Sequence, residues 1–550
     1  MTVHYEITLL NKAFTSGDFS LPNSVRIVEL QNQTKVREYD LGVLETEDLY
    51  RLIDSKSPID FENIYVRDFS LREYRRLRKI AEDAVVEIGP WKTSRCFFDC
   101  GSHIDFTYSN FTGGANFEES IFYHGTLDFT HAKLCGPIND FSHCHFGSHK
   151  VLFQYAEFLG RETNFEQSVF TAIYVSFINA ALLTELENFK RVHFMSGKVK
   201  FHFADFGDGL KTFEKMKFHG SLFDFRRVNW GKGKVDFRRA VFTSAHVTFE
   251  EMVMTGGKMT FRMARFEGGD LTFRRGDFGP DEINFDYVKF GSQAINFDGC
   301  TLGKLSMMNT EVRSSLDLRL KSGNEIDLSS AYLYGVTDLN FERKDTIKTL
   351  VLYRTRNLGK IVIHWDRNNV RQLISDQNFP DSYKAEQFNL IKDNFARNGQ
   401  YTDEDKAYVC FKRYEHKVLR RHYYKKLGSW GFLSSIYFHY RKIVFDRLGL
   451  FATSPGRVLL SMGIIISGFA TMFLLTELLG WGSIVNAITL SDHLGLVSRS
   501  FYHSAITFFT VGYGDTLPTG FSRILSALEG WIGVFLMAYF TVAFVRKALR

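Results

Sequence analysis

The sequence predicts a β-solenoid, followed by an α-helical linker and an all-α domain with two membrane-spanning helices. Three observations support this prediction. Phenylalanine recurs every 12 residues over 16 units in the first part of the chain. Near the C-terminus, two apolar segments are each long enough to cross a bilayer, which takes about 20 residues of helix. A short stretch with alternating glycines lies between these two segments.

Residues 1–96 precede the repeats, and we expect them to form a cap on the solenoid. The stretch Ser70-Leu71-Arg72-Glu73 is a capping box. It predicts the start of a charged helix that continues to about Ala84. No chemistry is assigned to this region.

The solenoid is predicted for residues 97–365, and its strict 12-residue repeat covers residues 117–302. A second large apolar residue follows each repeated Phe by five positions. A small or apolar residue is expected two positions before each repeated Phe. Neither the helical period of 3.6 nor a long alternation fits this spacing. Coils that stack each Phe on the next coil at about 4.8 Å explain it. The coil length stays open, because one turn could take either one repeat or two.

The paired five-residue steps resemble pentapeptide-repeat proteins, with two residues inserted after every second pentapeptide. The resemblance implies a right-handed β-helix for this part of the chain.

Other functions of the solenoid are disfavoured by its residues. The histidines show no repeated ligand spacing, so no metal site and no cofactor are expected. Arginines such as Arg226 and Arg227 interrupt the acidic face that a DNA mimic needs. The chain also has no GxSxG, HExxH or GxxxxGK[ST] motif. We therefore expect no enzyme activity and no nucleic-acid partner.

Residues 366–450 are expected to form a helical hairpin and a basic linker at a membrane surface. One helix is predicted from Ser382 to Asn398 and a second from about Asp403 to Lys426. Between residues 412 and 447, ten Lys or Arg residues are interleaved with aromatic residues such as Trp430. This mixture is typical of a segment that contacts lipid. Nucleic-acid binding is the less favoured reading, because a membrane helix follows closely.

Residues 451–550 are predicted to contain the two membrane helices. Val458 to Thr476 carries no charge and is the expected outer helix, and Ile524 to Val545 is the expected inner, pore-lining helix. Ser500 to Phe509 is too short to span and is expected to be a re-entrant pore helix. Basic residues on the flanks of the two long segments place both termini in the cytoplasm. The expected location is the plasma membrane, or the inner membrane of a Gram-negative cell.

The stretch between the membrane segments reads Thr510-Val511-Gly512-Tyr513-Gly514-Asp515. It resembles the selectivity filter of two-transmembrane-helix prokaryotic potassium channels. Glycine permits the alternating backbone that aims successive carbonyl groups at one axis, where they replace the water around an ion. The resemblance implies that K⁺, as the permeant ion, is coordinated at Thr510, Val511, Gly512 and Tyr513, with Gly514 completing the filter. A ring of carbonyl groups needs four filters, which implies a homotetramer.

The same resemblance assigns Asp515 to the outer acidic position. Some relatives have a Glu behind the filter that holds this Asp, but this chain has Ile506. Tyr502 or His503 is therefore expected to hold Asp515. Glu529 of the inner helix is expected to face the pore helix as filter support, and an orientation toward the outer surface is the alternative.

Gly533 is the expected gating hinge of the inner helix, with Gly530 beside it, because glycine removes bulk that resists bending. The alternative is that both glycines only allow close helix contact. Phe540 or Phe544 is expected near the inner constriction.

These features together predict a potassium-selective channel with a cytoplasmic solenoid that regulates it or docks a partner. The regulator is expected to be a protein or a small molecule. Two alternatives stay open: a weakly selective or non-selective cation channel, and a membrane-anchored solenoid scaffold with a vestigial pore. A chain that begins near Asp403 is expected to form the channel without the solenoid.

Overall fold

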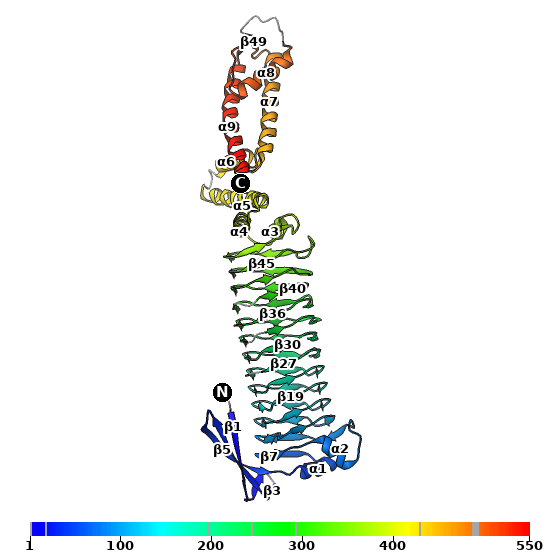
Figure 1. Ribbon diagram of the computed structural model, residues 1–550. Coiled ribbons are helices and arrows are strands. Elements are labelled where there is room, and N and C mark those ends of the chain that lie inside the picture. The colour runs from blue at the N-terminus through cyan, green and yellow to red at the C-terminus, as the bar shows by residue number, and fades with distance from the viewer. Residues whose placement is uncertain are drawn as a thin grey trace. The chain divides into compact units, whose positions relative to one another are not determined.

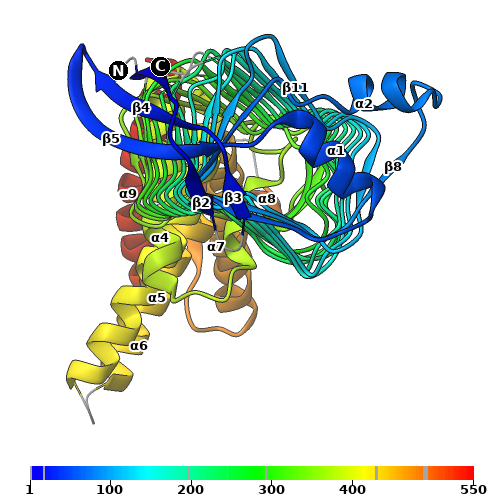
Figure 2. The ribbon, with the colours of Figure 1, turned by 90° about the horizontal axis from the view of Figure 1, so that it is seen from below.

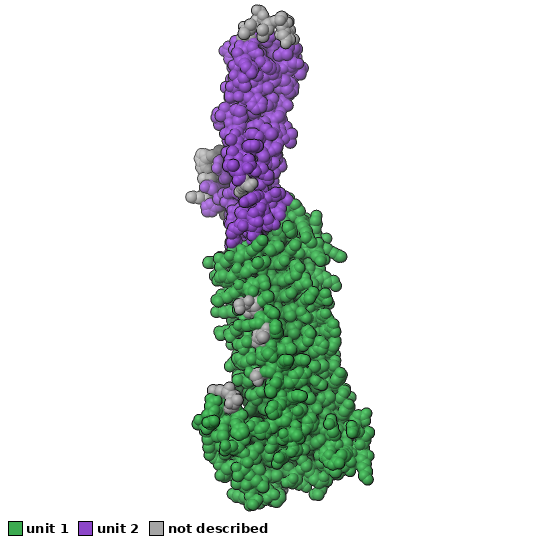
Figure 3. Space-filling model, in the orientation of Figure 1, with its two compact units in different colours: residues 1–377 green, residues 378–550 purple. Residues whose placement is uncertain are grey.

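The computed structural model describes residues 3–16, 19–195, 197–243, 246–291, 294–427, 431–486 and 494–549. The chain divides into two compact units, residues 1–377 and residues 378–550 (Figure 3). The first unit contains the solenoid, and the second contains the helices of the linker and of the membrane domain.

One coil of the solenoid takes two repeats, which answers the question that the sequence leaves open. Ile121 of β14 (Ile121–Tyr123) pairs in parallel with His145 of β18 (His145–Gly147), two repeats further along the chain. His145 pairs in turn with Val169 of β22 (Val169–Phe170). About 13 such turns over residues 42–362 confirm the predicted β-solenoid, and Figure 1 shows the stacked coils.

The coils contribute strands to four parallel sheets. Figure 2 looks along the stack and shows successive coils lying over one another. The sheets extend from β7 (Ile64–Arg67) to β47 (Arg356–Asn357), from β11 (His103–Asp105) to β48 (Lys360–Val362), from β6 (Ile59–Glu62) to β46 (Thr349–Val351), and from β8 (Val86–Ile88) to β24 (Ala181–Leu182). Isolated bridges continue the last sheet as far as Thr301. Because β6, β7 and β8 precede residue 97, solenoid strands begin inside the region that the sequence assigns to a cap.

The repeated Phe side chains form the core of the solenoid. All of them are fully buried. Each stacks on the Phe two repeats away, with ring centroids 4.6–5.3 Å apart. Two such ladders meet edge to face, as Phe129 and Phe141 do at 5.9 Å. Since burial of one Phe stabilises by roughly 1.5–3 kcal/mol, the ladders replace a globular core.

A corner follows each repeated Phe, and its second residue has a left-handed backbone. Glu119, His131 and Arg227 are examples, with φ angles of 58°, 59° and 54°. This conformation costs an L-residue about 1–2 kcal/mol. A polar side chain before the Phe often supports the corner, as when Asn116 Oδ1 accepts a hydrogen bond from the Glu118 N–H group at 2.9 Å.

Four consecutive coils carry a polar side chain in the core, two positions before a repeated Phe. The expectation of a small or apolar residue there is wrong at Asn139, Thr163, Glu187 and Lys211, all of which are fully buried. A buried polar group is costly unless it is hydrogen-bonded. These residues therefore need partners inside the coil.

Lys211 and Glu187 are the charged members of this polar row. Lys211 Nζ donates to the carbonyl oxygens of Gly207 and Lys232 at 2.7 and 2.9 Å. Glu187 Oε1 accepts a hydrogen bond from the Thr184 N–H group at 3.0 Å, whereas Oε2 has no partner in the described part of the chain. Burial raises the pKa of Glu187 to about 8 and lowers the pKa of Lys211.

We expect Glu187 to make the solenoid less stable as the pH rises. Its pKa is near 4.5 in the unfolded chain and about 8 in the folded one, so its stabilising contribution is complete below pH 4.5 and is lost by pH 8. Glu187→Gln should reduce the loss of unfolding free energy between pH 5.5 and 8.5 by ~1–3 kcal/mol. Denaturant midpoints at both pH values measure this difference.

Glu185→Gln is the matched control, because Glu185 lies on the exposed side of the same coil. An equal pH dependence of wild type and Glu187→Gln would show that Glu187 is charged in the folded chain.

The N-terminal strands cover one end of the solenoid. β1 (Val3–Leu10), β4 (Ser24–Gln31) and β5 (Thr34–Val43) form an antiparallel sheet, which β5 joins to β7. Tyr5 packs in a cluster with Phe97 and Tyr123, and its hydroxyl group lies 2.9 Å from His145 Nδ1. This end of the parallel stack is therefore continued by paired strands.

The same N-terminal region contains two helices, α1 (Thr46–Asp54) and α2 (Leu71–Arg78). The predicted N-cap is confirmed, because the Ser70 side chain accepts a hydrogen bond from the Glu73 N–H group at 3.2 Å, but the Glu73 carboxylate accepts from Arg76 and does not complete the capping box. The helix is shorter than predicted. Lys79 has a left-handed backbone and ends it before Ala84. At the other end of the solenoid, α3 (Val370–Ser375) contacts β46.

The second unit consists mainly of helices. They are α4 (Asp381–Arg397), α5 (Tyr401–Leu427), α6 (Gly431–Arg441), the π-helix η2 (Lys442–Arg447), α7 (Pro455–Leu478), α8 (Leu496–Phe508) and α9 (Ser522–Ala548). The predicted hairpin is confirmed, since α4 packs on α5 and Phe388 stacks on Tyr414 at 5.5 Å. On α6, Ile436 and Tyr437 are exposed, as a lipid contact requires, while Trp430 lies outside the described residues.

Candidate ion-conduction site

Two helices of the second unit are long and apolar enough to cross a membrane. They are α7 and α9, of 24 and 27 residues. Both extend a few residues beyond the predicted segments. α7 begins with Pro455 at its first turn, where a missing N–H group costs no hydrogen bond.

The short helix α8 packs between these two helices. It contacts both α7 and α9. Ser504 Oγ lies 2.8 Å from the Ile466 carbonyl oxygen of α7 and also contacts the Glu529 carboxyl group of α9, so these two oxygens share its single O–H donor. The helix ends at Phe508, directly before the glycine-containing stretch, so its C-terminus points toward the chain that follows. This is the position that the sequence predicts for a pore helix.

The backbone of the filter stretch alternates between two conformations. Thr510, Gly512 and Gly514 have φ angles of 54°, 54° and 78°, whereas Val511 and Tyr513 have negative φ. Glycine adopts such positive angles at little cost, and Thr510 does so with its N–H group bonded to the Thr507 carbonyl oxygen at 3.1 Å. Alternation of this kind turns successive carbonyl groups toward one side of the strand.

Two side chains of the stretch 510–514 have few neighbours within the chain. Tyr513 is 73% exposed, and Val511 is 49% exposed. Apolar side chains at membrane depth normally pack against protein or lipid. Their exposure leaves a surface on which other subunits can pack.

Tyr502 and His503 have different partners. The Tyr502 hydroxyl group donates to Asp515 Oδ2 at 2.7 Å. The two ring nitrogens of His503 lie 2.9 and 3.0 Å from the hydroxyl groups of Thr516 and Ser526. Of the two candidates for holding Asp515, only Tyr502 makes a direct hydrogen bond to it in the described structure.

A two-stranded sheet holds the chain after the filter. β50 (Thr516–Pro518) pairs antiparallel with β49 (Ile484–Asn486), which belongs to the link that follows α7. Nearby, Arg499 of α8 forms an ion pair with Glu477 of α7. The chain after residue 515 is therefore attached to the link, while the ion pair joins the start of α8 to the end of α7. Much of the rest of the link lies outside the described residues.

Glu529 faces the pore helix. Its side chain is fully buried and accepts the hydrogen bond from Ser504. The alternative orientation, toward the outer membrane surface, is not the one that the structure shows. A buried carboxyl group is costly unless it is hydrogen-bonded, and Ser504 supplies this contact from α8 to the inner helix.

The two glycines of α9 differ in their surroundings. A Cβ atom on Gly533 would lie 2.0 Å from the Phe508 carbonyl oxygen, but one on Gly530 would find its nearest neighbour, the Thr507 carbonyl oxygen, at 3.8 Å. Gly533 thus allows the close contact of α9 with the end of α8. This geometry favours the packing interpretation of Gly533 over the hinge.

We expect Gly533→Ala to destabilise the pore domain, because the added methyl group has no room. The cost of such overpacking is ~1–3 kcal/mol. Gly530→Ala should have little effect and is the matched control. Thermal unfolding of the purified variants measures both changes. Normal stability of Gly533→Ala, combined with altered open probability, would support a hinge instead.

The C-terminal end of α9 contains the two aromatic residues expected at the constriction. The rings of Phe540 and Phe544 lie 5.9 Å apart, and Phe544 is 54% exposed in the single subunit. Tyr539 lies on another side of the helix, where its hydroxyl group donates to the Phe445 carbonyl oxygen at 3.2 Å. Phe544 is thus open to contact with other subunits, whereas Phe540 is half-buried and packs against the cluster that contains Leu536 and Ala543.

The hairpin holds the last turn of α9 through an acidic cluster that sequence reasoning missed. Arg546 donates to Asp405 Oδ1 at 2.9 Å, and Lys547 Nζ donates to Asp405 Oδ2 at 3.3 Å. The Arg546 guanidinium group also lies 4.5 Å from the centroid of the Tyr408 ring. Asp405 is buried, so this contact is screened less than a surface ion pair. Its only signal in the sequence is the acidic start of α5.

A second ion pair joins the hairpin to the segment before α7. Arg413 of α5 makes a bidentate contact with Asp446 of η2, with nitrogen–oxygen distances of 2.7–3.1 Å. α5 therefore contacts the chain at the start of one membrane helix and at the end of the other.

A comparison with protein-family models identifies the C-terminal region. Residues 473–550 match the family described as ion channel. Neither the curated proteins nor the solved structures include a significant match to the chain. The matched residues contain α8, the filter stretch and α9. The C-terminal part of the chain is thus an ion-channel domain of the type with two membrane-spanning helices, and it is joined to a β-solenoid.

Proposed function

We propose that this protein is a potassium-selective channel formed by four identical subunits. The observation that carries the proposal is the alternating backbone of residues 510–514, in which positive φ recurs at every second residue. Rings of backbone carbonyl groups replace the hydration shell of K⁺ without binding the ion by full charges. In this assignment, K⁺ is coordinated at Thr510, Val511, Gly512 and Tyr513.

The exposure of the filter supports the four-subunit assembly. Tyr513 and Trp531 are 73% and 68% exposed in one subunit, although both lie in the membrane domain. One chain supplies one filter strand, and a closed ring of strands requires symmetry around the ion path. Packing between subunits would cover these aromatic surfaces.

The orientation follows from the basic residues at both ends of the membrane domain. Arg441, Lys442 and Arg447 precede α7, while Arg546 and Lys547 end α9. By the positive-inside rule, we propose that these ends and the solenoid lie in the cytoplasm. The proposed location of the channel is the plasma membrane. In this position the solenoid can act as a regulatory or docking domain.

Ion flux through reconstituted protein tests this function. Purified full-length protein in liposomes should carry K⁺ much faster than Na⁺. Equal K⁺ and Na⁺ fluxes would support the non-selective cation channel. An absence of flux with correct tetramer assembly would support the scaffold with a vestigial pore. Crosslinking followed by mass measurement determines the assembly independently of flux.

A further inference from the structure

The solenoid has a hollow where its regular repeat ends. Earlier coils take two full repeats, but the coils that join Phe290 to Val312 and Val312 to Leu333 are both shorter than that. The isolated bridges of the fourth sheet also stop at Thr301. A hollow of about 750 Å³ lies on the surface of the solenoid beside these shorter coils.

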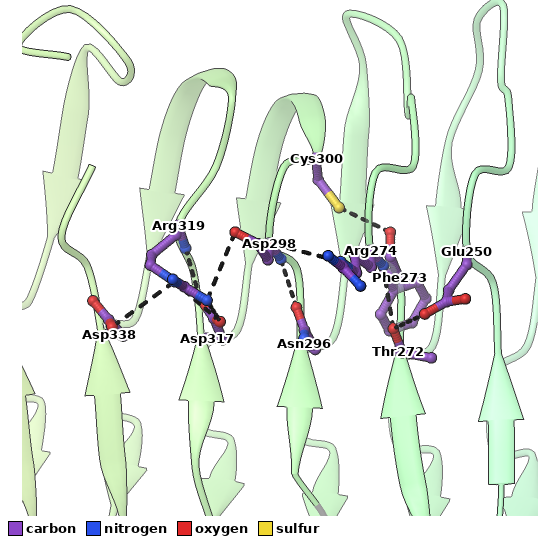
Figure 4. A network of polar contacts seen from close by, with 10 residues as sticks. All are labelled: Glu250, Thr272, Phe273, Arg274, Asn296, Asp298, Cys300, Asp317, Arg319 and Asp338. Carbon is purple, nitrogen blue, oxygen red and sulfur yellow. Dashed lines mark hydrogen bonds and ion pairs between the residues drawn. The ribbon is translucent and has the colours of Figure 1, made fainter. Parts of the chain in front are cut away.

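Most acidic side chains near the hollow form ion pairs with Arg319, as Figure 4 shows. Arg319 lies 2.5 Å from Asp317, 3.7 Å from Asp298 and 3.9 Å from Asp338, so it bridges three successive coils. Asp298 also lies 3.6 Å from Arg274. These carboxylates therefore have cationic partners already and do not neutralise the other arginines of the hollow.

Four further basic side chains line the hollow, namely Arg275, Lys321, Arg343 and Arg367. None of them forms an ion pair with any residue in the described ranges of the chain. The remaining acids of the lining are Asp277 and Glu342, so the basic side chains are in excess. Asn340 also lines the hollow, and its buried Oδ1 atom has no hydrogen-bond partner there.

These features fit an anionic ligand of small-molecule size. Ligand sites usually have volumes of about 300–1,000 Å³. Guanidinium groups present several donors in a plane and suit phosphate oxygens. The Asn340 Oδ1 atom is a hydrogen-bond acceptor, so it can accept from a hydroxyl or amino group of the ligand but not from its phosphate oxygens. We propose that this hollow binds a phosphate-bearing anion.

The binding residues come from four places that are separate in the sequence. Arg275 and Lys321 belong to two coils with one coil between them, Arg343 belongs to the loop that follows β45 (Val336–Asp338), and Arg367 lies three residues before α3. A ligand that contacts all of them ties the last coils to the segment that leads out of the solenoid. If the protein is the channel proposed above, this ligand is a regulator of the channel.

Binding of pyrophosphate and ATP to the full-length protein tests the site. Calorimetry in about 0.15 M salt should show saturable binding of at least one of these probes, because screening at this ionic strength suppresses non-specific attraction. The double variant Arg343→Gln/Arg367→Gln should bind at least tenfold more weakly. Arg313→Gln is the control, because Arg313 lies on an affected coil outside the hollow and pairs with Glu311. Its binding should equal that of wild type.

A lipid headgroup carries the same phosphate chemistry, so a second measurement uses vesicles that contain phosphatidic acid. Vesicle binding that the double variant weakens and Arg313→Gln does not, without binding of the soluble probes, assigns the hollow to a headgroup. No binding of either kind, or equal binding by wild type and the double variant, overturns the proposal. Because none of these measurements depends on ion flux, their outcome is independent of whether the pore conducts.

Discussion

Gly514→Ala should abolish selective K⁺ conduction while the protein still assembles. Gly514 has a φ angle of 78°, which an L-residue adopts only at a cost of ~1–2 kcal/mol, and in the proposed tetramer this cost arises four times. The added strain should turn the neighbouring carbonyl groups away from the ion path. We expect the K⁺ over Na⁺ permeability ratio, measured from reversal potentials, to fall at least tenfold.

Gly495→Ala provides the control for this experiment. Gly495 precedes the pore helix with a φ angle of −59°, and nothing lies within 4 Å of an added Cβ atom in the subunit. This variant should keep the wild-type permeability ratio. Retained selectivity in Gly514→Ala would show that the positive φ at residue 514 is not needed for ion selection.

Asp405→Asn should raise the open probability of the channel. Asp405 binds both Arg546 and Lys547, which holds the last turn of the inner helix against the hairpin. Since α9 is continuous from Ser522 to Ala548, a movement that widens its C-terminal end must break these contacts. Coupling of this kind is typically worth about 1–3 kcal/mol, or a 5–150-fold change in the ratio of open to closed states. Single-channel recording measures it.

Two variants make this test specific. Asp403→Asn removes a neighbouring carboxylate that faces Lys406 at 3.6 Å, and it should leave gating unchanged. The exchange Asp405→Arg/Arg546→Asp restores an ion pair with reversed polarity, so it should return the open probability toward that of wild type. An Asp405→Asn channel that gates like wild type would exclude the hairpin as a restraint on α9.

Regular spacing explains why so much of the architecture can be predicted. A Phe at every twelfth position predicts stacked coils. An uncharged apolar segment of membrane length predicts a membrane-spanning helix. The coil length could not be deduced, because coils of one repeat and of two repeats place the same Phe side chains in the core. Only backbone pairing distinguishes them, as in the match of Ile121 with His145.

Contacts between distant segments account for most of what the sequence does not reveal. The pairing of Asp405 with Arg546 joins residues 141 positions apart, and neither residue stands in a recognisable motif. Buried Glu187 and Lys211 look like surface residues in the sequence, since charged side chains are rarely buried completely. For Gly533, the sequence leaves a hinge and a close contact equally open, and only the position of the Phe508 carbonyl oxygen separates them.

The hairpin contacts also change the design of a shortened channel. A chain that begins near Asp403 would lose α4, although α4 packs along α5 and Arg421 of α5 pairs with Asp381 of α4 at 2.7 Å. The second compact unit begins at residue 378. A truncation at that residue keeps the whole hairpin and is the better test of whether the pore works without the solenoid.

The two-repeat coil restricts how such a protein can evolve. A duplication of two repeats adds one complete turn and leaves every later strand in its own sheet. A duplication of a single repeat preserves the Phe pattern equally well, but it rotates all later coils by half a turn. The row that holds Glu187 and Lys211 would then continue on the opposite side of the core, and the hollow at Arg343 would open on the opposite face. Changes in solenoid length are therefore tolerated most easily in pairs of repeats.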